Sequence, residues 1–209
     1  MTPDTCPFFV VENFMSPLVC ETAVDSINLT VPDYNSEGTK PIISVLESPT
    51  IERLVFNRLE MFIPKIEQRY GVQYKGTHSV EFQWLAQGCE GEAPHAENSE
   101  FLREKWLRIR DNDLTGVVFL SDFNDNTPFD GEFEVYGGKH EFPQHGFGFQ
   151  PQRGTLVVFP SAPHFVNHTL PIIVGDLYRV KFYISTQVPY LYDPNRFPGD
   201  YSTWFKGYQ

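Results

Sequence analysis

The chain has 209 residues, of which 41% are hydrophobic and 15% aromatic, a composition typical of a folded domain. Acidic side chains outnumber basic ones by 27 to 16, and the net charge of −11 disfavours broad binding to nucleic acid. The sequence shows neither the pattern of a signal peptide nor an apolar stretch long enough to span a membrane, so we expect a cytoplasmic protein with no membrane partner.

A single domain over residues 1–209 is expected, because the chain has no internal repeat and no low-complexity linker. Its three cysteines, Cys6, Cys20 and Cys89, are widely spaced and odd in number. They predict free thiols rather than a disulfide framework or a CxxC metal site.

The first elements along the chain are a strand and a helix. The apolar run over residues 7–14 predicts a short strand. Ser16 and Pro17 then form a typical helix start, with serine as N-cap and proline at the first helical position, and the helix is expected to end near Leu29. Residues 32–48 are rich in turn formers and predict a loop.

A second helix is predicted after Pro49 and Thr50, where apolar residues recur at helical spacing. Pro64 is expected to kink or end it. The stripe indicates a packing face directed at the core, and it consists of Ile51, Leu54, Val55, Phe62 and Ile66.

From Gly71 onward the pattern changes to short strands rich in β-branched and aromatic residues, separated by Gly, Pro, Asn and Asp. The predicted strands cover residues 80–86, 114–123, 131–137, 154–160 and 177–185. Helices followed by a run of strands predict an α+β fold, with the helices packed on one face of a sheet sandwich or barrel.

The stretch "PHAENS" places His95 and Glu97 two residues apart after a Gly-containing turn. In an extended segment both side chains point to the same side, so an imidazole and a carboxylate could bind one metal ion. An H-x-E pair occurs often by chance, and a solvated loop is the alternative unless a third ligand is found.

Further candidates follow some seventy residues later, where "FPSAPHFVNHTLP" offers His164 and His168. In the strand after it, alternation places Arg179, Lys181 and Tyr183 on one face. A cation in a core-forming strand needs an anion, because an unpaired buried charge is costly. The anion could be an acidic side chain, or a bound carboxylate gripped by the guanidinium, and a solvent-facing strand edge is a further alternative.

Two histidines and one carboxylate on one face of an octahedral ion form the facial triad of non-haem Fe(II) oxygenases. Three coordination positions would remain for a chelating 2-oxoacid and dioxygen, and Arg179 could hold the far carboxylate of that acid. The same donors would also suit a zinc hydrolase, but that alternative lacks a clear general base and leaves Arg179 unexplained.

The order of these motifs resembles the Fe(II)- and 2-oxoglutarate-dependent dioxygenases of the prolyl hydroxylase superfamily, and within it the prolyl 3-hydroxylase (leprecan) catalytic domain. The similar segments span most of the chain and are "PFFVVENFMSPLVCETAV", "PHAENS", "IRDNDLTGVVFLSDFN", "PFDGEFEVYGG", "RGTLVVFPS" and "NHTLPIIVGDLYRV". The resemblance implies a double-stranded β-helix (jelly-roll) core with N-terminal packing helices.

The resemblance also implies the roles of four residues. His95, Glu97 and His168 would be the iron ligands, with His164 as the runner-up for the distal position, and Arg179 would bind the C5 carboxylate of 2-oxoglutarate. The implied cofactors are Fe(II), 2-oxoglutarate as co-substrate and O2, with ascorbate as a further candidate. The implied reaction is hydroxylation of an unactivated C–H bond, with a prolyl residue in a peptide or protein as the leading substrate and a free amino acid or another small molecule as the alternative.

Glu97 departs from the family pattern, which has aspartate at this position. One extra methylene moves the carboxylate oxygen, so a catalytically impaired metal-binding or interaction domain of the same fold stays an alternative. We expect the loops over 98–113 and 124–150 to position the substrate, and we expect His140 and His145 to be surface-loop histidines.

Overall fold

The computed structural model describes residues 6–30, 42–46, 49–126, 133–193 and 195. Its largest element is a six-stranded sheet in which every pair of neighbours is antiparallel. In spatial order its strands are β1 (Phe9–Val11), β11 (Leu156–Pro160), β6 (Leu114–Phe119), β14 (Leu177–Thr186), β3 (Tyr74–Leu85) and β2 (Ile42–Leu46).

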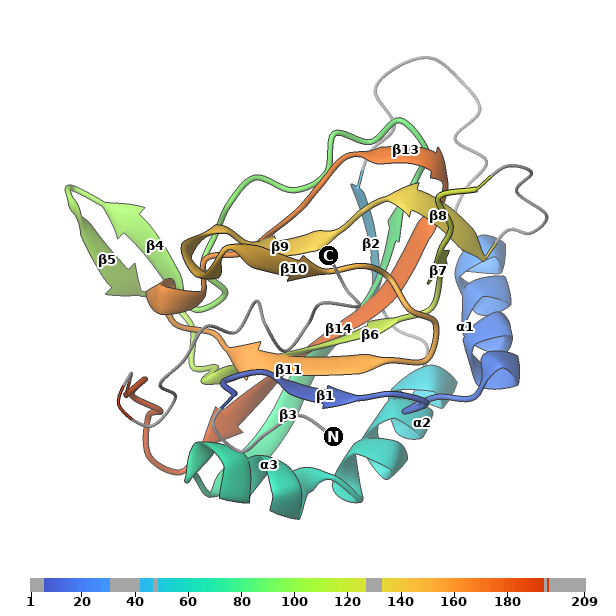
Figure 1. Cartoon of the computed structure of the whole chain (residues 1–209). Helices are drawn as coiled ribbons and strands as arrows, with labels where there is room; N and C mark the ends of the chain where they lie inside the picture. The colour runs from blue at the N-terminus through green and yellow to red at the C-terminus, as the bar shows by residue number, and fades with distance from the viewer. Residues whose placement is uncertain (1–5, 31–41, 47–48, 127–132, 194, 196–209) are drawn as a thin grey trace.

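Three smaller sheets complete the β-structure of the described residues (Figure 1). One contains β10 (Phe147–Phe149), β9 (His140–Phe142) and β12 (His168–Thr169), and another contains β13 (Ile172–Gly175), β8 (Glu134–Gly137) and β7 (Asp122–Phe123). The third is the hairpin of β4 (Ser99–Leu102) and β5 (Lys105–Arg108), which projects from the body of the molecule. Single turns of 3-10 helix lie at Pro143–His145 and Pro163–Phe165.

The helices are α1 (Pro17–Thr30), α2 (Pro49–Glu60) and α3 (Ile63–Tyr70). The predicted start of α1 is confirmed, and the Ser16 hydroxyl accepts a hydrogen bond from the Val19 N–H at 3.4 Å. None of the described helices is long and apolar enough to cross a membrane.

The second predicted helix is in fact two helices, because a turn at Met61 and Phe62 interrupts it. Pro64 lies in the first turn of α3, where its missing N–H leaves no helical hydrogen bond unmade, so it begins a helix rather than kinking one. Ile51, Val55 and Ile66 of the predicted stripe are buried, whereas Leu54 is 39% exposed.

The strand predicted over residues 7–14 is β1 at Phe9–Val11, and the five strands predicted after Gly71 are all present within the described residues, although their ends differ. The stretch over 114–123 divides into β6 and β7, and residues 131–132 lie outside the described residues. The prediction of a loop over 32–48 is wrong for Ile42–Leu46, which form an edge strand beside β3. The expected substrate loop over 98–113 contains the β4–β5 hairpin, and that over 124–150 contains three strands.

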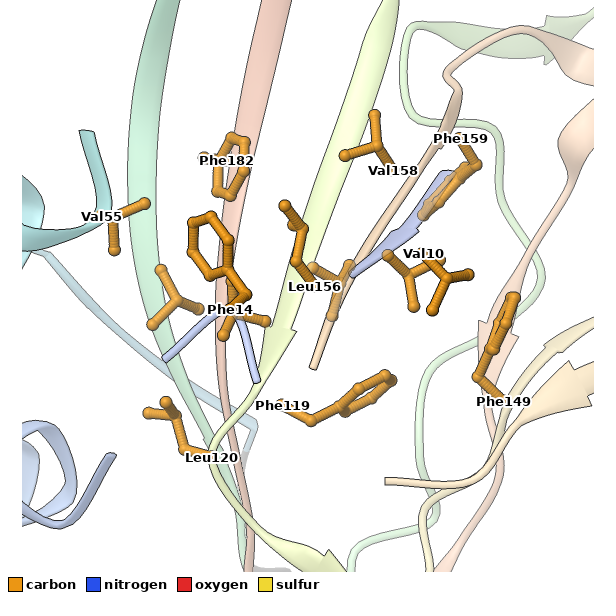
Figure 2. Packing of buried hydrophobic residues seen from close by; sticks show 14 of the residues in the cluster. Val10, Phe14, Val55, Phe119, Leu120, Phe149, Leu156, Val158, Phe159 and Phe182 are labelled. Atoms are coloured by element: carbon orange, nitrogen blue, oxygen red, sulfur yellow. The ribbon is translucent and has the colours of Figure 1, made fainter. Parts of the chain in front are cut away.

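The core is rich in aromatic side chains, and Figure 2 shows Phe14 and Phe182 on the side of Val55 in α2. The Phe182 ring on β14 lies over Gly116 on the neighbouring β6, where any side chain would meet it. Phe182, Val180 and Ile184 share one face of β14. The residues between them therefore point to the opposite face, which is also buried.

Gly116→Ala is expected to destabilise the protein by about 1–3 kcal/mol, because the added methyl group would overlap the Phe182 ring in a packed core. Urea unfolding monitored by circular dichroism measures the effect. Gly76→Ala is the matched control, since a methyl group there meets no atom within 4 Å, and it should change stability little. Equal effects for the two variants would contradict the close contact.

Candidate functional site

Two chain segments run antiparallel and bring distant residues of the predicted site together. His95 and Asn167 exchange backbone hydrogen bonds of 3.0 and 2.9 Å, the Glu92 N–H donates to the Thr169 carbonyl at 2.9 Å, and the Asn98 N–H donates to the Ser161 carbonyl at 3.2 Å. His95 therefore faces Asn167 across this ladder.

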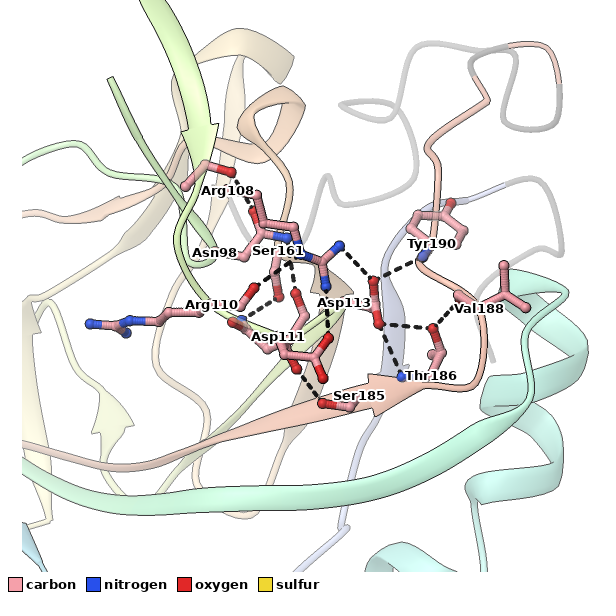
Figure 3. A network of polar contacts seen from close by, with 12 residues as sticks. Asn98, Arg108, Arg110, Asp111, Asp113, Ser161, Ser185, Thr186, Val188 and Tyr190 are labelled. Atoms are coloured by element: carbon pink, nitrogen blue, oxygen red, sulfur yellow. Dashed lines mark hydrogen bonds and ion pairs between the residues drawn. The ribbon is translucent and has the colours of Figure 1, made fainter. Parts of the chain in front are cut away.

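A buried polar network anchors the segment immediately after Glu97 (Figure 3). The Asn98 amide donates to the Asn112 carbonyl at 2.9 Å, and the Asn112 amide donates to the Ser161 hydroxyl at 3.0 Å. The neighbouring Asp113 carboxylate accepts hydrogen bonds from the backbone N–H and the hydroxyl of Thr186, at 3.0 and 2.8 Å. These contacts fix the segment against the ends of β6, β11 and β14.

The Glu97 carboxylate has two close nitrogen neighbours. Its Oε1 lies 2.7 Å from the Lys181 Nζ and 3.2 Å from the His95 Nε2. Glu97 and Lys181 are each only 3% exposed, whereas His95 is half-buried and reaches solvent. The structure thus confirms that His95 and Glu97 point to the same place, and it adds Lys181 to the pair.

Electrostatics favours charged forms in this cluster. Burial by itself would raise the pKa of Glu97, but the Lys181 ammonium and His95 lower that pKa well below its usual range. Burial would lower the pKa of His95, yet the hydrogen bond and charge of Glu97 outweigh it and raise the pKa. The His95 Nδ1 also faces the Ala93 carbonyl at 2.8 Å, so both ring nitrogens face acceptors, as an imidazolium requires.

Arg179 is completely buried and is held by three side chains. Its Nη2 lies 2.6 Å from the Glu92 Oε2, its Nε donates to the Gln83 Oε1 at 2.6 Å, and its Nη1 donates to the Thr169 hydroxyl at 2.7 Å. Burial would raise the pKa of Glu92, but Arg179 and Lys181 lower it far below the ordinary value. Of the alternatives open from the sequence, the structure has an internal ion pair.

His140 is a member of this cluster that the sequence did not predict. The expectation of a surface-loop histidine is wrong, because His140 lies on β9 and is only 1% exposed. Its Nδ1 lies 3.5 Å from both the Arg179 Nη1 and the Thr169 Oγ1. Burial, with the Arg179 guanidinium beside it, lowers the pKa of His140 to about 3, so the ring is neutral. The one signal was the alternation of His140 and Phe142 in a short strand.

His168 lies apart from the Glu97 cluster. Thr169 points toward Arg179, so strand alternation directs its neighbour His168 to the other face, where its Nε2 lies 3.3 Å from the Glu141 Oε2. The runner-up His164 is exposed, and its ring centroid lies 5.3 Å from that of Tyr192.

The described residues contain no group of three or more His, Cys, Asp and Glu side chains placed to hold a metal ion. His95 and Glu97 supply two of the donors that a facial triad needs, and the residue opposite His95 is Asn167. The side chains as arranged therefore do not fit Fe(II), and the Arg179 guanidinium already holds a carboxylate.

The chain is similar to known proteins in structure but not detectably in sequence. No protein-family model matches the chain, and no curated protein matches it in sequence. A viral collagen prolyl hydroxylase from Paramecium bursaria Chlorella virus 1, solved with 2-oxoglutarate, superposes with a TM-score of 0.62 at 16% identity, over 87% of this chain and 96% of that one. The chain has the prolyl hydroxylase fold.

Two further solved structures agree with this assignment. A Pseudomonas putida prolyl-4-hydroxylase has a TM-score of 0.59 at 15% identity, over 88% of this chain and 95% of that one. A Trichoplax adhaerens prolyl hydroxylase, in complex with a hypoxia-inducible factor peptide, has a TM-score of 0.57 at 13% identity, over 93% and 87%. The predicted α+β class with a jelly-roll core and N-terminal helices is confirmed, as is the resemblance to prolyl hydroxylases at the level of the fold.

His140 should make the protein less stable as the pH falls from about 6.5 toward 4.5. In this window the unfolded chain binds a proton on His140, with an ordinary pKa of 6.5, whereas the folded chain binds it only near pH 3. His140→Asn is expected to reduce the slope of unfolding free energy against pH by up to about 1.4 kcal/mol per unit. Urea titrations at several pH values measure it.

The control for this measurement is His95→Asn. The pKa of His95 is raised, so its contribution to stability is complete below pH 6.5 and is lost only as the pH rises through the folded value. His95→Asn should leave the slope between pH 6.5 and 4.5 unchanged. A slope that His140→Asn does not alter would contradict a neutral, buried His140.

Proposed function

We propose that the protein is a 2-oxoglutarate-dependent oxygenase of the prolyl hydroxylase type, acting on a prolyl residue in a peptide or protein. The observation that carries the proposal is the prolyl hydroxylase fold, which extends over 87% of this chain and 96% of the viral collagen prolyl hydroxylase. His95 and Glu97 support the proposal, because an imidazole and a carboxylate are ligands of the kind that non-haem iron prefers. Their Nε2 and Oε1 atoms lie 3.2 Å apart, and the His95 side chain is partly exposed to solvent.

The proposed reaction uses O2 and 2-oxoglutarate and yields an alcohol, succinate and CO2. A peptide substrate is favoured by the Trichoplax relative, whose structure contains a peptide. The proposal includes a single domain over 1–209, a cytoplasmic location and no nucleic-acid partner, in keeping with the net charge of −11.

Turnover would require rearrangements of the side chains described above. Glu97 would have to leave Lys181, and a third ligand would have to come from His168, which bonds Glu141 on the opposite face of its strand. Arg179 would have to exchange the Glu92 carboxylate for that of 2-oxoglutarate. We derive no step through iron from the present arrangement.

One observation favours a second candidate function, a binding domain of the same fold without turnover. The Lys181 ammonium lies 2.7 Å from Glu97 in a site where both side chains are nearly inaccessible to solvent. Such a domain would bind an extended peptide but would not hydroxylate it.

Anaerobic addition of Fe(II) and 2-oxoglutarate separates the two candidates. An oxygenase of the proposed type should give a visible charge-transfer band, and admission of air should then produce succinate. Absence of both the band and succinate would reject the oxygenase and leave the binding domain, which isothermal titration with proline-containing peptides tests.

The distal ligand is tested by replacing each candidate with alanine. If His168 is the ligand, as the resemblance implies, His168→Ala should abolish succinate formation, with a loss of at least about 100-fold. His164→Ala is the matched control and should leave it nearly unchanged, because His164 lies exposed at the surface. Equal rates for wild type and His168→Ala would exclude His168.

A further inference from the structure

The inner face of β14 carries two cations, and each is paired with a carboxylate of the same segment of chain. Lys181 pairs with Glu97 and Arg179 pairs with Glu92, at 2.7 and 2.6 Å. A site ready to bind a metal ion and an anionic co-substrate would instead have an unpaired carboxylate for the metal ion and an unpaired guanidinium for the co-substrate.

We infer that this site is completed by its own side chains: Lys181 takes the place of a metal cation on Glu97, and Glu92 takes the place of a bound carboxylate on Arg179. A divalent metal and the Lys181 ammonium therefore compete for Glu97. The inference rests on the site named in the proposed function and bears on turnover there, because Fe(II) would have to displace the Lys181 ammonium from Glu97.

The position of Lys181 indicates that its ammonium and a metal ion cannot both bind Glu97. Its backbone lies between β6 and β3, paired with Val117 and Glu81, so the strand cannot carry the ammonium away from Glu97. Lys181 is 3% exposed, and moving its charge off the carboxylate would leave an unpaired buried cation. A second cation on the same carboxylate would be repelled by the first.

The donors on His95 and Asn167 are also poorly suited to a metal ion. The two ring nitrogens of His95 face Glu97 and the Ala93 carbonyl, and metal binding would require one of them without its proton. Asn167, which faces His95, has an amide oxygen with no hydrogen-bond partner among the described residues. A neutral amide oxygen is a poor replacement for a histidine ligand of Fe(II).

The anion side of the site is closed in the same way. The Nε, Nη1 and Nη2 atoms of Arg179 contact Gln83, Thr169 and Glu92, respectively. The Thr169 hydroxyl also donates to the Glu92 carboxylate at 2.6 Å, which ties the acid to the strand opposite. A small dicarboxylate would have to displace Glu92 from the guanidinium of Arg179, which is completely buried.

The test compares wild type with Lys181→Met, using Mn(II) alone as the probe. Wild type should show no saturable Mn(II) binding by isothermal titration, and its melting temperature should respond neither to EDTA nor to Mn(II). Lys181→Met frees Glu97, so this variant should bind Mn(II) at least about tenfold more tightly than wild type, and Mn(II) should raise its melting temperature.

Two control variants isolate the charge on residue 181. Lys181→Arg retains a cation beside Glu97 and should bind Mn(II) as weakly as wild type. The double variant with Lys181→Met and Glu97→Gln lacks both charges, and it should remain folded without responding to Mn(II).

The inference is overturned if wild type binds one Mn(II) per chain and loses melting temperature in EDTA, or if Lys181→Met binds Mn(II) no more tightly than wild type. Should Lys181→Met fail to fold, the wild-type measurements alone decide the question. A wild-type protein that Mn(II) stabilises would contradict competition between the metal and Lys181, whereas one whose melting temperature responds to neither Mn(II) nor EDTA would support it. Failure of the proposed function is a separate result, since it is read from succinate formation with Fe(II) and 2-oxoglutarate.

Discussion

Burial of two cations on one strand is the constraint on which the rest of the site depends. Phe182, on the hydrophobic face of β14, lies on the side of Val55 in α2 in Figure 2, and alternation then directs Arg179 and Lys181 into the interior between the sheets. Neither charge can reach water, so the fold must bring a carboxylate to each. Glu92 and Glu97 meet this requirement from a single extended segment, which residues 161–172 hold in place through backbone hydrogen bonds.

The spacing of the two acids reflects the geometry of the strands. Arg179 and Lys181 are two residues apart on one face, and their partners lie on a less regular segment in which Glu92 and Glu97 are five apart. The buried network around Asn98 and Asp113 secures one end of that segment, and the bond between Glu92 and Thr169 secures the other. Hydrogen bonds therefore tie both ends of the segment that carries the two acids to the surrounding strands.

Much of the fold could be predicted from sequence, because strong local patterns specify it: the start of α1 at Pro17 and the alternation of β14 are examples. The same alternation predicted that Arg179 and Lys181 share a face. The partners of these cations could not be predicted, since they depend on long-range register. His95 pairs with Asn167, and a shift of one residue in the register between their two segments would pair it with His168 instead. The sequence spacing between these residues and Arg179 does not determine that register. His140 was missed because its short strand is defined only by its neighbours.

The pairing of Lys181 with Glu97 also has a consequence for how the protein folds in a cell. A site whose charge is balanced only by a metal ion leaves the new chain dependent on delivery of that metal before its interior is satisfied. Here the counter-ion of Glu97 is Lys181, a residue of the chain itself. If the inference above holds, the free energy of unfolding should not depend on the supply of iron.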